Sequence, residues 1–375
     1  KDFKLEYKLQ AEYYTYNYTL QNKNHKGNLF DYGYIGKFSS EKVPMYSSQT
    51  YYDPELGKNV YPMNGLYTTG LAFIPGDINP IAANYTSAIF NLYPGGFNNT
   101  NDLLSYRGLI NGYSPSSVYS LYNGQGTVYD QYVKRNNNRL DFSGTVNMSI
   151  GKNNMELGFS YEKNTRRYYS ISPVSIYKYM DQLTNNQFDG FNTNDPIQVI
   201  INGRVTDSVM YHRVYNAEGQ TVFDKNLRQK LGLAVNGTDW IDINSYDAKN
   251  RTIDYYDENY EKHTINFKGD LFSLDLFGED EVSGLMTGYG YDYKGNKIKS
   301  SSNDLSYFDT YMKPAFTPVD YAAWFSYKRE ILPKLNVEAG LRAEVYDAGL
   351  NVLKDPYTFS PAKTVAEVTA FTHPD

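Results

Sequence analysis

The sequence contains no cysteine and only four histidines among its 375 residues. Without cysteine, a disulfide framework and a thiolate zinc site are both excluded. No histidine has a second one at a metal-binding interval; the four are His25, His212, His263 and His373. No P-loop, nucleophile motif or dinucleotide fingerprint is present either. The sequence therefore predicts neither an enzyme nor a metal centre built on histidine.

An excess of basic residues and a long apolar run are also missing. Lysine and arginine number 36 against 42 aspartates and glutamates, so the net charge of -6 argues against a nucleic-acid-binding protein. No run of about 18 apolar residues exists, so no transmembrane helix is predicted. No signal peptide opens the sequence, and we expect an N-terminal region to precede Lys1.

Tyrosine, by contrast, is abundant. There are 40 tyrosines and aromatic residues make up 16% of the chain, yet the mean hydropathy is -0.61. A β-barrel in a membrane explains this pairing, because it needs apolar residues only at alternate strand positions, with aromatic residues at the lipid boundaries. Long polar loops then lower the average.

The first segment alternates strictly between apolar and polar residues. Phe3 to Tyr13 carries apolar or aromatic side chains at odd positions, while Lys4 to Glu12 carries polar or charged ones at even positions. This period of two over about 11 residues predicts a half-buried strand of membrane-crossing length. The charged face suits a wet lumen and the apolar face suits lipid.

Two further segments predict long hairpins with short turns. Alternation over 139–150 and 155–162 flanks a turn at 151–154, where glycine and asparagine suit positive φ. Alternation over 321–327 and 335–346 flanks a second turn at 329–334. Each of the four alternating runs predicts an antiparallel strand.

Long polar stretches separate these strands, at about 17–136 and 170–318. The second includes a predicted β-hairpin, 252–256 with 262–267, and a possible strand over 285–293, which we assign to the loop rather than to the membrane. Bacterial barrels have short periplasmic turns and long extracellular loops. Residues 1–375 are thus predicted to be part of one all-β domain, a transmembrane antiparallel β-barrel with long extracellular loops. Five to seven spanning strands cannot close it, so the chain is expected to belong to a larger barrel.

The C-terminal part resembles TonB-dependent receptors of the Bacteroidota branch. The resemblance rests on Tyr321–Lys328 followed by Leu335–Arg342, an aromatic-rich strand, a short turn and a strand ending in Gly-Leu-Arg. Ser326 and Tyr327 stand where the family usually has Gln-Asp. Weaker similar blocks, which extend over the last ~140 residues, are Asp239–Ile243, Phe272–Phe277, Gly290–Gly295 and Val352–Tyr357.

This resemblance implies a barrel of about 22 strands closed by an N-terminal plug. The plug and the segment that contacts TonB would lie outside residues 1–375. It implies active uptake of a nutrient, such as an iron chelate, glycan, cobalamin or peptide, across the outer membrane of a bacterial cell. A structural or docking subunit of an outer-membrane complex, with a surface lipoprotein or other subunits as partners, is the alternative. A secreted all-β binding protein or glycan hydrolase is less compatible with the alternating strands.

Six basic residues are predicted to converge at the outer rim, where they would bind lipopolysaccharide phosphates through charge-assisted hydrogen bonds. They are Lys134, Arg135, Arg139, Lys163, Arg166 and Arg167. A solvated rim is the simpler interpretation of the same residues.

Two sets of loop residues are further candidates. Tyrosine rings could contact a ligand or partner protein, or pack a small core of the loop itself; these are Tyr51, Tyr52, Tyr85, Tyr93, Tyr113, Tyr119 and Tyr122. Hard oxygen ligands could bind calcium, although their spacing is not that of an EF-hand and a polar loop is the simpler alternative; these are Asp181, Asp189, Asn192, Asn194 and Asp195. No other cofactor is predicted.

Overall fold

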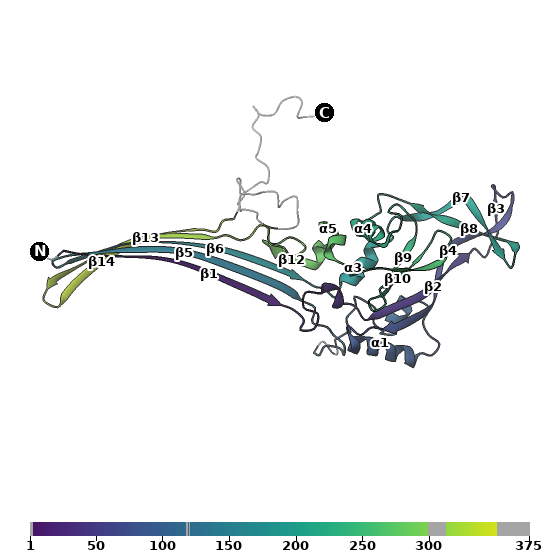
Figure 1. The fold of residues 1–375 in the computed structure, drawn as a ribbon, viewed down its shortest axis with the longest axis horizontal. Helices are drawn as coiled ribbons and strands as arrows, with labels where there is room; N and C mark the ends of the chain where they lie inside the picture. The colour runs from purple at the N-terminus through teal and green to yellow at the C-terminus, as the bar shows by residue number, and fades with distance from the viewer. Residues whose placement is uncertain (1–2, 118, 120, 299–312, 351–375) are drawn as a thin grey trace, which may run out of the picture.

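A computed structural model describes residues 3–117, 119, 121–298 and 313–350. The block Val352–Tyr357 and the histidine His373 lie outside these residues. The protein is mostly β-structure with few helices, as the sequence predicts. One long curved sheet extends from a globular head (Figure 1). We use "head" for the described residues of 21–131 and 172–285.

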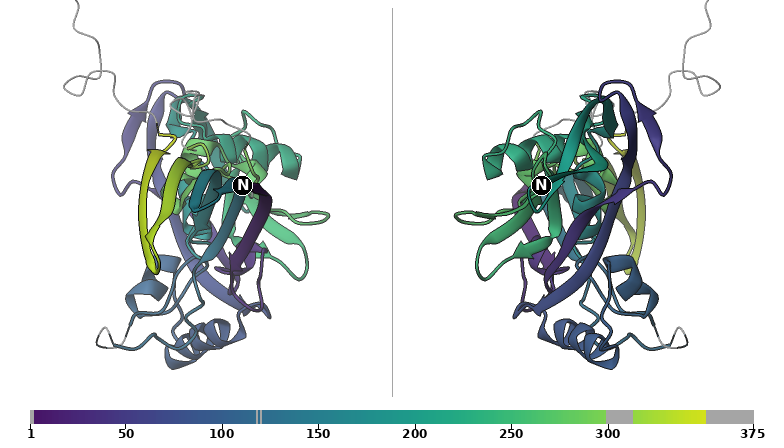
Figure 2. Two further views of the ribbon diagram at one scale, coloured as in Figure 1. Left: turned by 90° about the vertical axis from the view of Figure 1, so that its left-hand side faces the viewer. Right: turned by 90° about the vertical axis from the view of Figure 1, so that its right-hand side faces the viewer.

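The long sheet contains five long antiparallel strands and one short strand, with the spatial order β1-β5-β6-β13-β14 and β12 paired to the far end of β6. End-on views show β1 and β14 at opposite edges (Figure 2). The strands are β1 (Phe3–Leu20), β5 (Tyr132–Ile150), β6 (Asn153–Ile171), β12 (Met286–Tyr289), β13 (Val319–Leu332) and β14 (Leu335–Asp347).

Both predicted hairpins are present. β5 and β6 pair continuously from Ile150 with Asn153 outward, and Gly151 in the turn between them has a φ of 58°. β13 and β14 meet at a turn in which Lys334 has a φ of 69°. The strands extend further than predicted, because β1 continues to Leu20 and β5 already begins at Tyr132. The first predicted loop is correspondingly shorter.

Register places most of the apolar residues of all five long strands on one face. For example, Leu9 pairs with Gly144, Gly144 with Phe159, Phe159 with Ala323, and Ala323 with Ala343. Side chains alternate between faces along each strand, so the neighbouring positions follow. This surface, the apolar belt, comprises the alternate residues from Phe3 to Tyr13, Leu140 to Ile150, Met155 to Tyr161, Tyr321 to Tyr327 and Val337 to Val345.

The two predicted loops fold together into the head. The first contributes η1 (Leu29–Asp31), β2 (Gly36–Tyr46), β3 (Tyr51–Asp53), β4 (Lys58–Pro75), α1 (Pro80–Leu92) and α2 (Thr100–Ser105). The second contributes α3 (Ile176–Leu183), β7 (Phe188–Ile201), β8 (Arg204–Tyr215), α4 (Val222–Leu231), β9 (Trp240–Asp247), β10 (Thr252–Tyr256), β11 (Lys262–Asn266), η2 (Leu274–Leu276), α5 (Glu279–Val282) and η3 (Ser283–Leu285).

Two small sheets and one main core organise the head. The sheets have the strand orders β2-β4-β8-β7, with β3 added on β4, and β11-β10-β9. The predicted hairpin of β10 and β11 is therefore part of the head and not of the long sheet. Leu29 and Tyr34 of the first loop are buried in one cluster with Phe223, Leu227 and Ile253 of the second. The two loops are thus one packed unit.

The described residues do not form a closed barrel, because β1 and β14 leave the long sheet with two open edges. The predicted barrel of about 22 strands is consequently not seen. No helix among the described residues has the length and apolar character required to cross a bilayer.

Candidate functional site

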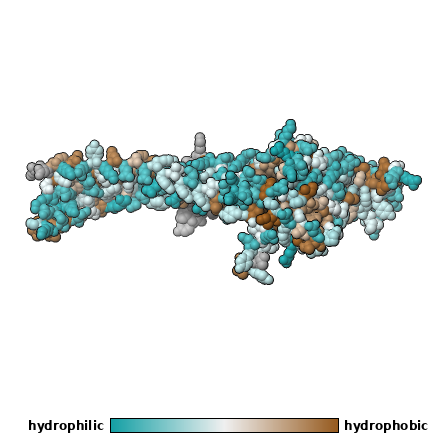
Figure 3. Space-filling view, turned by 60° about the horizontal axis from the view of Figure 1, so that its bottom comes forward, coloured by the Kyte–Doolittle hydropathy of each residue, from teal (hydrophilic) through white to brown (hydrophobic). Residues whose placement is uncertain are grey.

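The face of the long sheet opposite the apolar belt is polar. One face of the sheet is mostly hydrophilic in the space-filling view (Figure 3). One cross-strand row of the polar face consists of four carboxylates, Glu12, Asp141, Glu162 and Asp320. Like charges in direct opposition destabilise a sheet. Arg139 offsets part of this repulsion, because its guanidinium lies 2.8 Å from Asp141 and 3.2 Å from Glu162.

Further along the same face, toward the head, a row of tyrosines flanks an arginine. Tyr18 pairs with Arg135, Arg135 with Tyr168, and Tyr168 with Tyr289 of β12. The Arg135 guanidinium carbon lies 5.8 Å from the Tyr18 ring centre and 5.4 Å from that of Tyr168. Cation–π attraction to two rings therefore restrains this guanidinium.

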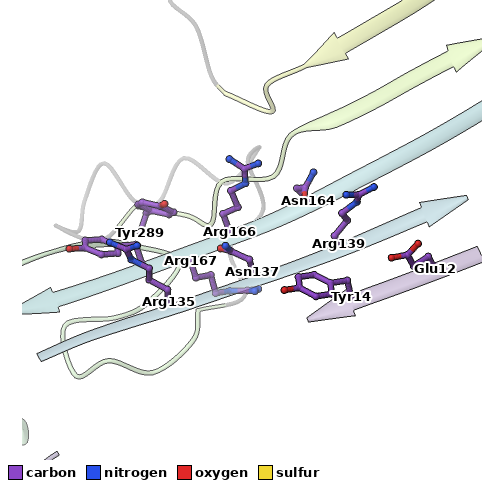
Figure 4. Close-up of a pocket in the computed structure, with 10 residues that line it drawn as sticks. Glu12, Tyr14, Arg135, Asn137, Arg139, Asn164, Arg166, Arg167 and Tyr289 are labelled. Atoms are coloured by element: carbon purple, nitrogen blue, oxygen red, sulfur yellow. The ribbon is translucent and has the colours of Figure 1, made fainter. Parts of the chain in front are cut away.

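These residues border a groove with a volume of about 570 Å³. Side chains from β1, β5, β6 and β12 line it (Figure 4). We call this set the arginine groove: Glu12, Tyr14, Arg135, Asn137, Arg139, Asn164, Arg166, Arg167, Tyr168 and Tyr289. Three of its arginines, Arg135, Arg139 and Arg166, have side chains on the polar face. Because Arg139 is paired with carboxylates, the positive charge of the groove comes mainly from Arg135 and Arg166.

The four arginines differ in their partners. Arg139 has the two carboxylates described above, and Arg167 donates a hydrogen bond of 3.1 Å to Asn136 Oδ1. Arg135 and Arg166 have no carboxylate at ion-pair distance in the part of the chain that the structure describes. The guanidinium carbon of Arg166 lies 5.9 Å from the ring centre of Phe316. The hydrogen-bond donors of Arg135 and Arg166 are therefore available to a ligand.

The six basic residues predicted at the outer rim are divided between the two faces. Arg135, Arg139 and Arg166 are on the polar face, whereas the alternation of β5 and β6 places Lys134, Lys163 and Arg167 on the face of the apolar belt. Lys134 Nζ donates a hydrogen bond of 3.2 Å to the Gly295 carbonyl. The six residues therefore do not converge on one surface, because neighbouring side chains of a strand point to opposite faces of the sheet.

The seven predicted tyrosines do not form one surface. Tyr85 and Tyr113 pack against a small core of the first loop, and Tyr93 contacts Tyr106 edge-on at 4.5 Å. Five of the seven are exposed, two on β3, one at the end of α1 and two in the segment after α2: Tyr51, Tyr52, Tyr93, Tyr119 and Tyr122. The structure therefore gives the partly buried Tyr85 and Tyr113 a packing role.

The predicted calcium ligands are distributed over two elements. Asp181 is on α3, where its Oδ1 accepts a hydrogen bond of 3.4 Å from Asn244 Nδ2. The others, Asp189, Asn192, Asn194 and Asp195, belong to β7. Among the described residues, the group of three side chains with metal-ligand spacing is a different one, Asp257, Glu261 and His263.

The head contains a second polar cavity of about 410 Å³, lined by residues of β2, β4, β9 and α3. Lys42 Nζ lies 3.7 Å from the centre of the Trp240 ring. Burial raises the pKa of Asp242 to about 7, and the nearby Lys42 only partly opposes this. Burial also lowers the pKa of Lys42, although Asp242 and Asp181 attract its charge.

Sequence reasoning did not identify Tyr14, Tyr168 and Tyr289 as groove residues, nor Tyr18 as a neighbour of Arg135. The signal available was the continued alternation of Tyr14, Tyr16 and Tyr18 on the charged parity of the first strand. Tyr289 offers no such signal, because its place depends on the pairing of β12 with β6. Long-range pairing is needed to find it.

Comparison of the chain with protein-family models, with curated proteins and with solved structures finds no match. The similarity to TonB-dependent receptors therefore rests on the sequence blocks quoted above, and the function has to be argued from the geometry.

Proposed function

We propose that the long sheet is part of the wall of an outer-membrane barrel and that the protein is a TonB-dependent receptor for active nutrient uptake. The observation that carries the barrel wall is the apolar belt. Register aligns it across five strands, and in β1 and β5 it extends over about 11 residues, the length of a transmembrane β-strand. The receptor assignment adds the sequence resemblance to this geometry.

The aromatic residues at the border of the belt support the proposal that the belt faces lipid. Toward the head, Phe142, Tyr161 and Tyr321 lie in one cross-strand row, and the Tyr161 and Tyr321 ring centres are 5.4 Å apart. The next row toward the head still contains Leu140, opposite Lys163, and beyond it the same face becomes polar, with Asn138 opposite Thr165. Aromatic residues typically occupy such a boundary between lipid and water.

The belt also explains why large apolar side chains lack cover. Tyr7, Leu9 and Leu341 are 78%, 74% and 77% exposed. Lipid on the belt and water on the polar face would solvate both surfaces of the sheet. Its open edges would pair with further strands, since unpaired backbone groups are not tolerated in hydrocarbon.

In this mechanism the head lies outside the cell and captures the nutrient. The nutrient then moves along the polar face after energy from TonB rearranges the plug. The residues described here supply the wall, the capture surface and the arginine groove rather than covalent chemistry.

Single-cysteine labelling tests this arrangement, because these 375 residues have no cysteine of their own. Leu9→Cys and Leu157→Cys on the belt should resist a water-soluble maleimide in outer membranes but react with a lipid-soluble one. Lys8→Cys and Asn147→Cys on the polar face are the matched controls and should react with the water-soluble reagent. Equal labelling of both pairs by the water-soluble reagent would refute the barrel wall.

A structural or docking role is the second candidate, favoured by the exposed aromatic residues of the head. Tyr51 and Tyr52 at β3 are 56% and 67% exposed. Energy-dependent uptake of a nutrient, lost when the gene is deleted or TonB is removed, supports the receptor. Stable co-purification with other outer-membrane subunits, without any uptake defect, supports the docking role.

A further inference from the structure

We propose that the arginine groove binds an anionic solute with a planar surface, held by Arg135 and Arg166. Carboxylate, phosphate and sulfonate groups share the required chemistry. This proposal names a ligand class for the proposed function and relies on it only for the assignment of the polar face to water.

Charge is the first argument. Arg139 is neutralised by Asp141 and Glu162, whereas Arg135 and Arg166 have no carboxylate at ion-pair distance among the described residues. Arginine presents a planar fork of donors that matches carboxylate and phosphate oxygens in pairs. A ligand with two acidic groups would satisfy both forks and offset the positive charge of the groove.

Preorganisation is the second argument. Arg135 lies between Tyr18 and Tyr168, both within 6 Å of its guanidinium carbon. The Tyr168 ring in turn lies 6.1 Å from the ring of Tyr289. Rings that already restrain the guanidinium reduce the entropy lost when a ligand binds. They also offer flat contact surfaces, which favour a planar or ring-containing anion.

Neutral donors complete the groove. Asn137, Asn164 and the Tyr14 hydroxyl line it beside the arginines, and each can donate a hydrogen bond to an anionic oxygen. The row of carboxylates that contains Glu12 and Asp141 lies next to the row of Tyr14 and Arg139, on its side away from the head. An anion is therefore attracted to the arginine side and repelled from the carboxylate side, which fixes where it binds.

A lipid headgroup fits this position poorly. The groove is on the polar face, whereas a lipid beside the barrel would contact the opposite face with the apolar belt. Lys163, opposite Leu140 and Val319, is a basic residue on that lipid-facing side. We therefore assign the groove to a solute in the lumen and not to lipopolysaccharide.

Binding of pyrene tetrasulfonate, a fluorescent planar anion, to the detergent-purified protein tests the proposal by fluorescence anisotropy. The double variant Arg135→Gln/Arg166→Gln should bind it roughly 30-fold more weakly, because two charged hydrogen-bonding forks are lost. The control Lys225→Gln/Lys230→Gln removes the same charge from exposed positions of α4 and should leave the affinity unchanged. If both double variants bind the anion more weakly to the same degree, the effect is one of net charge and the proposed site is wrong.

A second variant guards against misfolding. Arg135→Lys keeps the charge but loses the planar fork, so it should weaken binding by a smaller factor, roughly 5-fold. If Arg135→Lys and Arg135→Gln/Arg166→Gln both bind the anion with unchanged affinity, the proposal is wrong. Lipopolysaccharide co-purified with each protein is measured in parallel, and its loss from the Arg135→Gln/Arg166→Gln variant alone would identify a lipid ligand and also overturn the proposal.

The two proposals fail in different ways. If maleimide labelling finds the apolar belt in water while anion binding still depends on Arg135 and Arg166, the barrel wall is wrong and the anion site stands. If the labelling supports the wall but the anion does not depend on these arginines, only the ligand class is wrong.

Discussion

The head and the long sheet use similar apolar residues in opposite ways. Phe223, Leu227 and Ile253 of the head are completely buried among other side chains of the chain. Leu9 and Leu341 of the sheet are exposed, although they belong to regularly paired strands. Burial of apolar surface is the main favourable term in folding. The head obtains it from its own packing, whereas the exposed apolar side chains of the sheet would obtain it only from the lipid of the proposed barrel wall.

The same kind of substitution should therefore affect the stability of the two regions differently. The free energy of unfolding of the head should fall when internal packing is lost or a buried charge loses its partner. The stability of the sheet should depend on which of its two faces carries an introduced charge. The two tryptophans separate the measurements, because Trp240 is in the head and Trp324 in the sheet.

The largest expected effect is in the head. Arg228 and Asp224 form a completely buried ion pair with Nε and Oδ2 2.7 Å apart. Asp224→Ala leaves the guanidinium buried without its carboxylate and should lower the free energy of unfolding by about 3–5 kcal/mol. Trp240 fluorescence during urea unfolding, in a Trp324→Phe background, measures this loss. An unchanged midpoint would show that the head does not depend on its internal packing of charge.

The next effect contrasts the two faces of the sheet. Leu157→Arg places a charge in the apolar belt and should lower stability in lipid by about 2–4 kcal/mol near the bilayer midplane. Asn147→Arg places it on the polar face between Glu6 and Glu156 and should be tolerated. Folding into lipid vesicles, followed by Trp324 fluorescence in a Trp240→Phe background, compares them. Equal costs would contradict the assignment of the faces.

A pH-dependent effect in the head follows from Asp242, whose pKa is raised to about 7 by burial. The folded state retains a proton that the unfolded state releases near pH 4, so this group makes stability fall as the pH rises from about 4 to 7. Asp242→Asn should therefore be more stable than the wild type at pH 8 by roughly 2–4 kcal/mol, with little difference at pH 4.

Urea unfolding at the two pH values measures this, with Trp240 as the reporter. Asp189→Asn, at an exposed aspartate of β7, is the matched control and should show no such gain. A gain of Asp242→Asn that is the same at both pH values would exclude titration of this carboxyl as its cause.

The smallest effect concerns the border of the belt. The coupling between Tyr161 and Tyr321, whose rings are in contact, should be about 1 kcal/mol. A double-mutant cycle with leucine at each position, measured in vesicles, gives this value. Coupling that is absent would remove the aromatic border as a contributor to stability, without affecting the belt.

Local pattern was sufficient to predict the five long strands of the long sheet, whereas the short β12, which pairs with β6, was assigned to the loop. Alternation with a period of two identified β1, β5, β6, β13 and β14, since each strand carries that pattern itself. The turns at Gly151 and Lys334 were also recognisable from their flanking strands. The end of β1 was placed too early and the start of β5 too late, because the alternating residues there become tyrosine, asparagine and arginine, which also suit loops.

The head could not be predicted in this way. Its strands and helices are short, and its core joins Leu29 and Tyr34 with residues about 200 positions further along the chain, such as Leu227 and Ile253. Such contacts have no local period. The distribution of the six basic residues over two faces was also not predicted. The prediction grouped them by position along the strands and did not consider which face each side chain is on.

The sequence alone determined that this protein has alternating strands, tight turns and two long polar insertions, because each of these depends on neighbours along the chain. Only the tertiary structure decided that the strands align their apolar residues into one belt. Only the tertiary structure, too, decided that Arg135 and Arg166 share a groove with Tyr168 and Tyr289. Both depend on cross-strand register, which is set by hydrogen bonds between segments distant in the sequence.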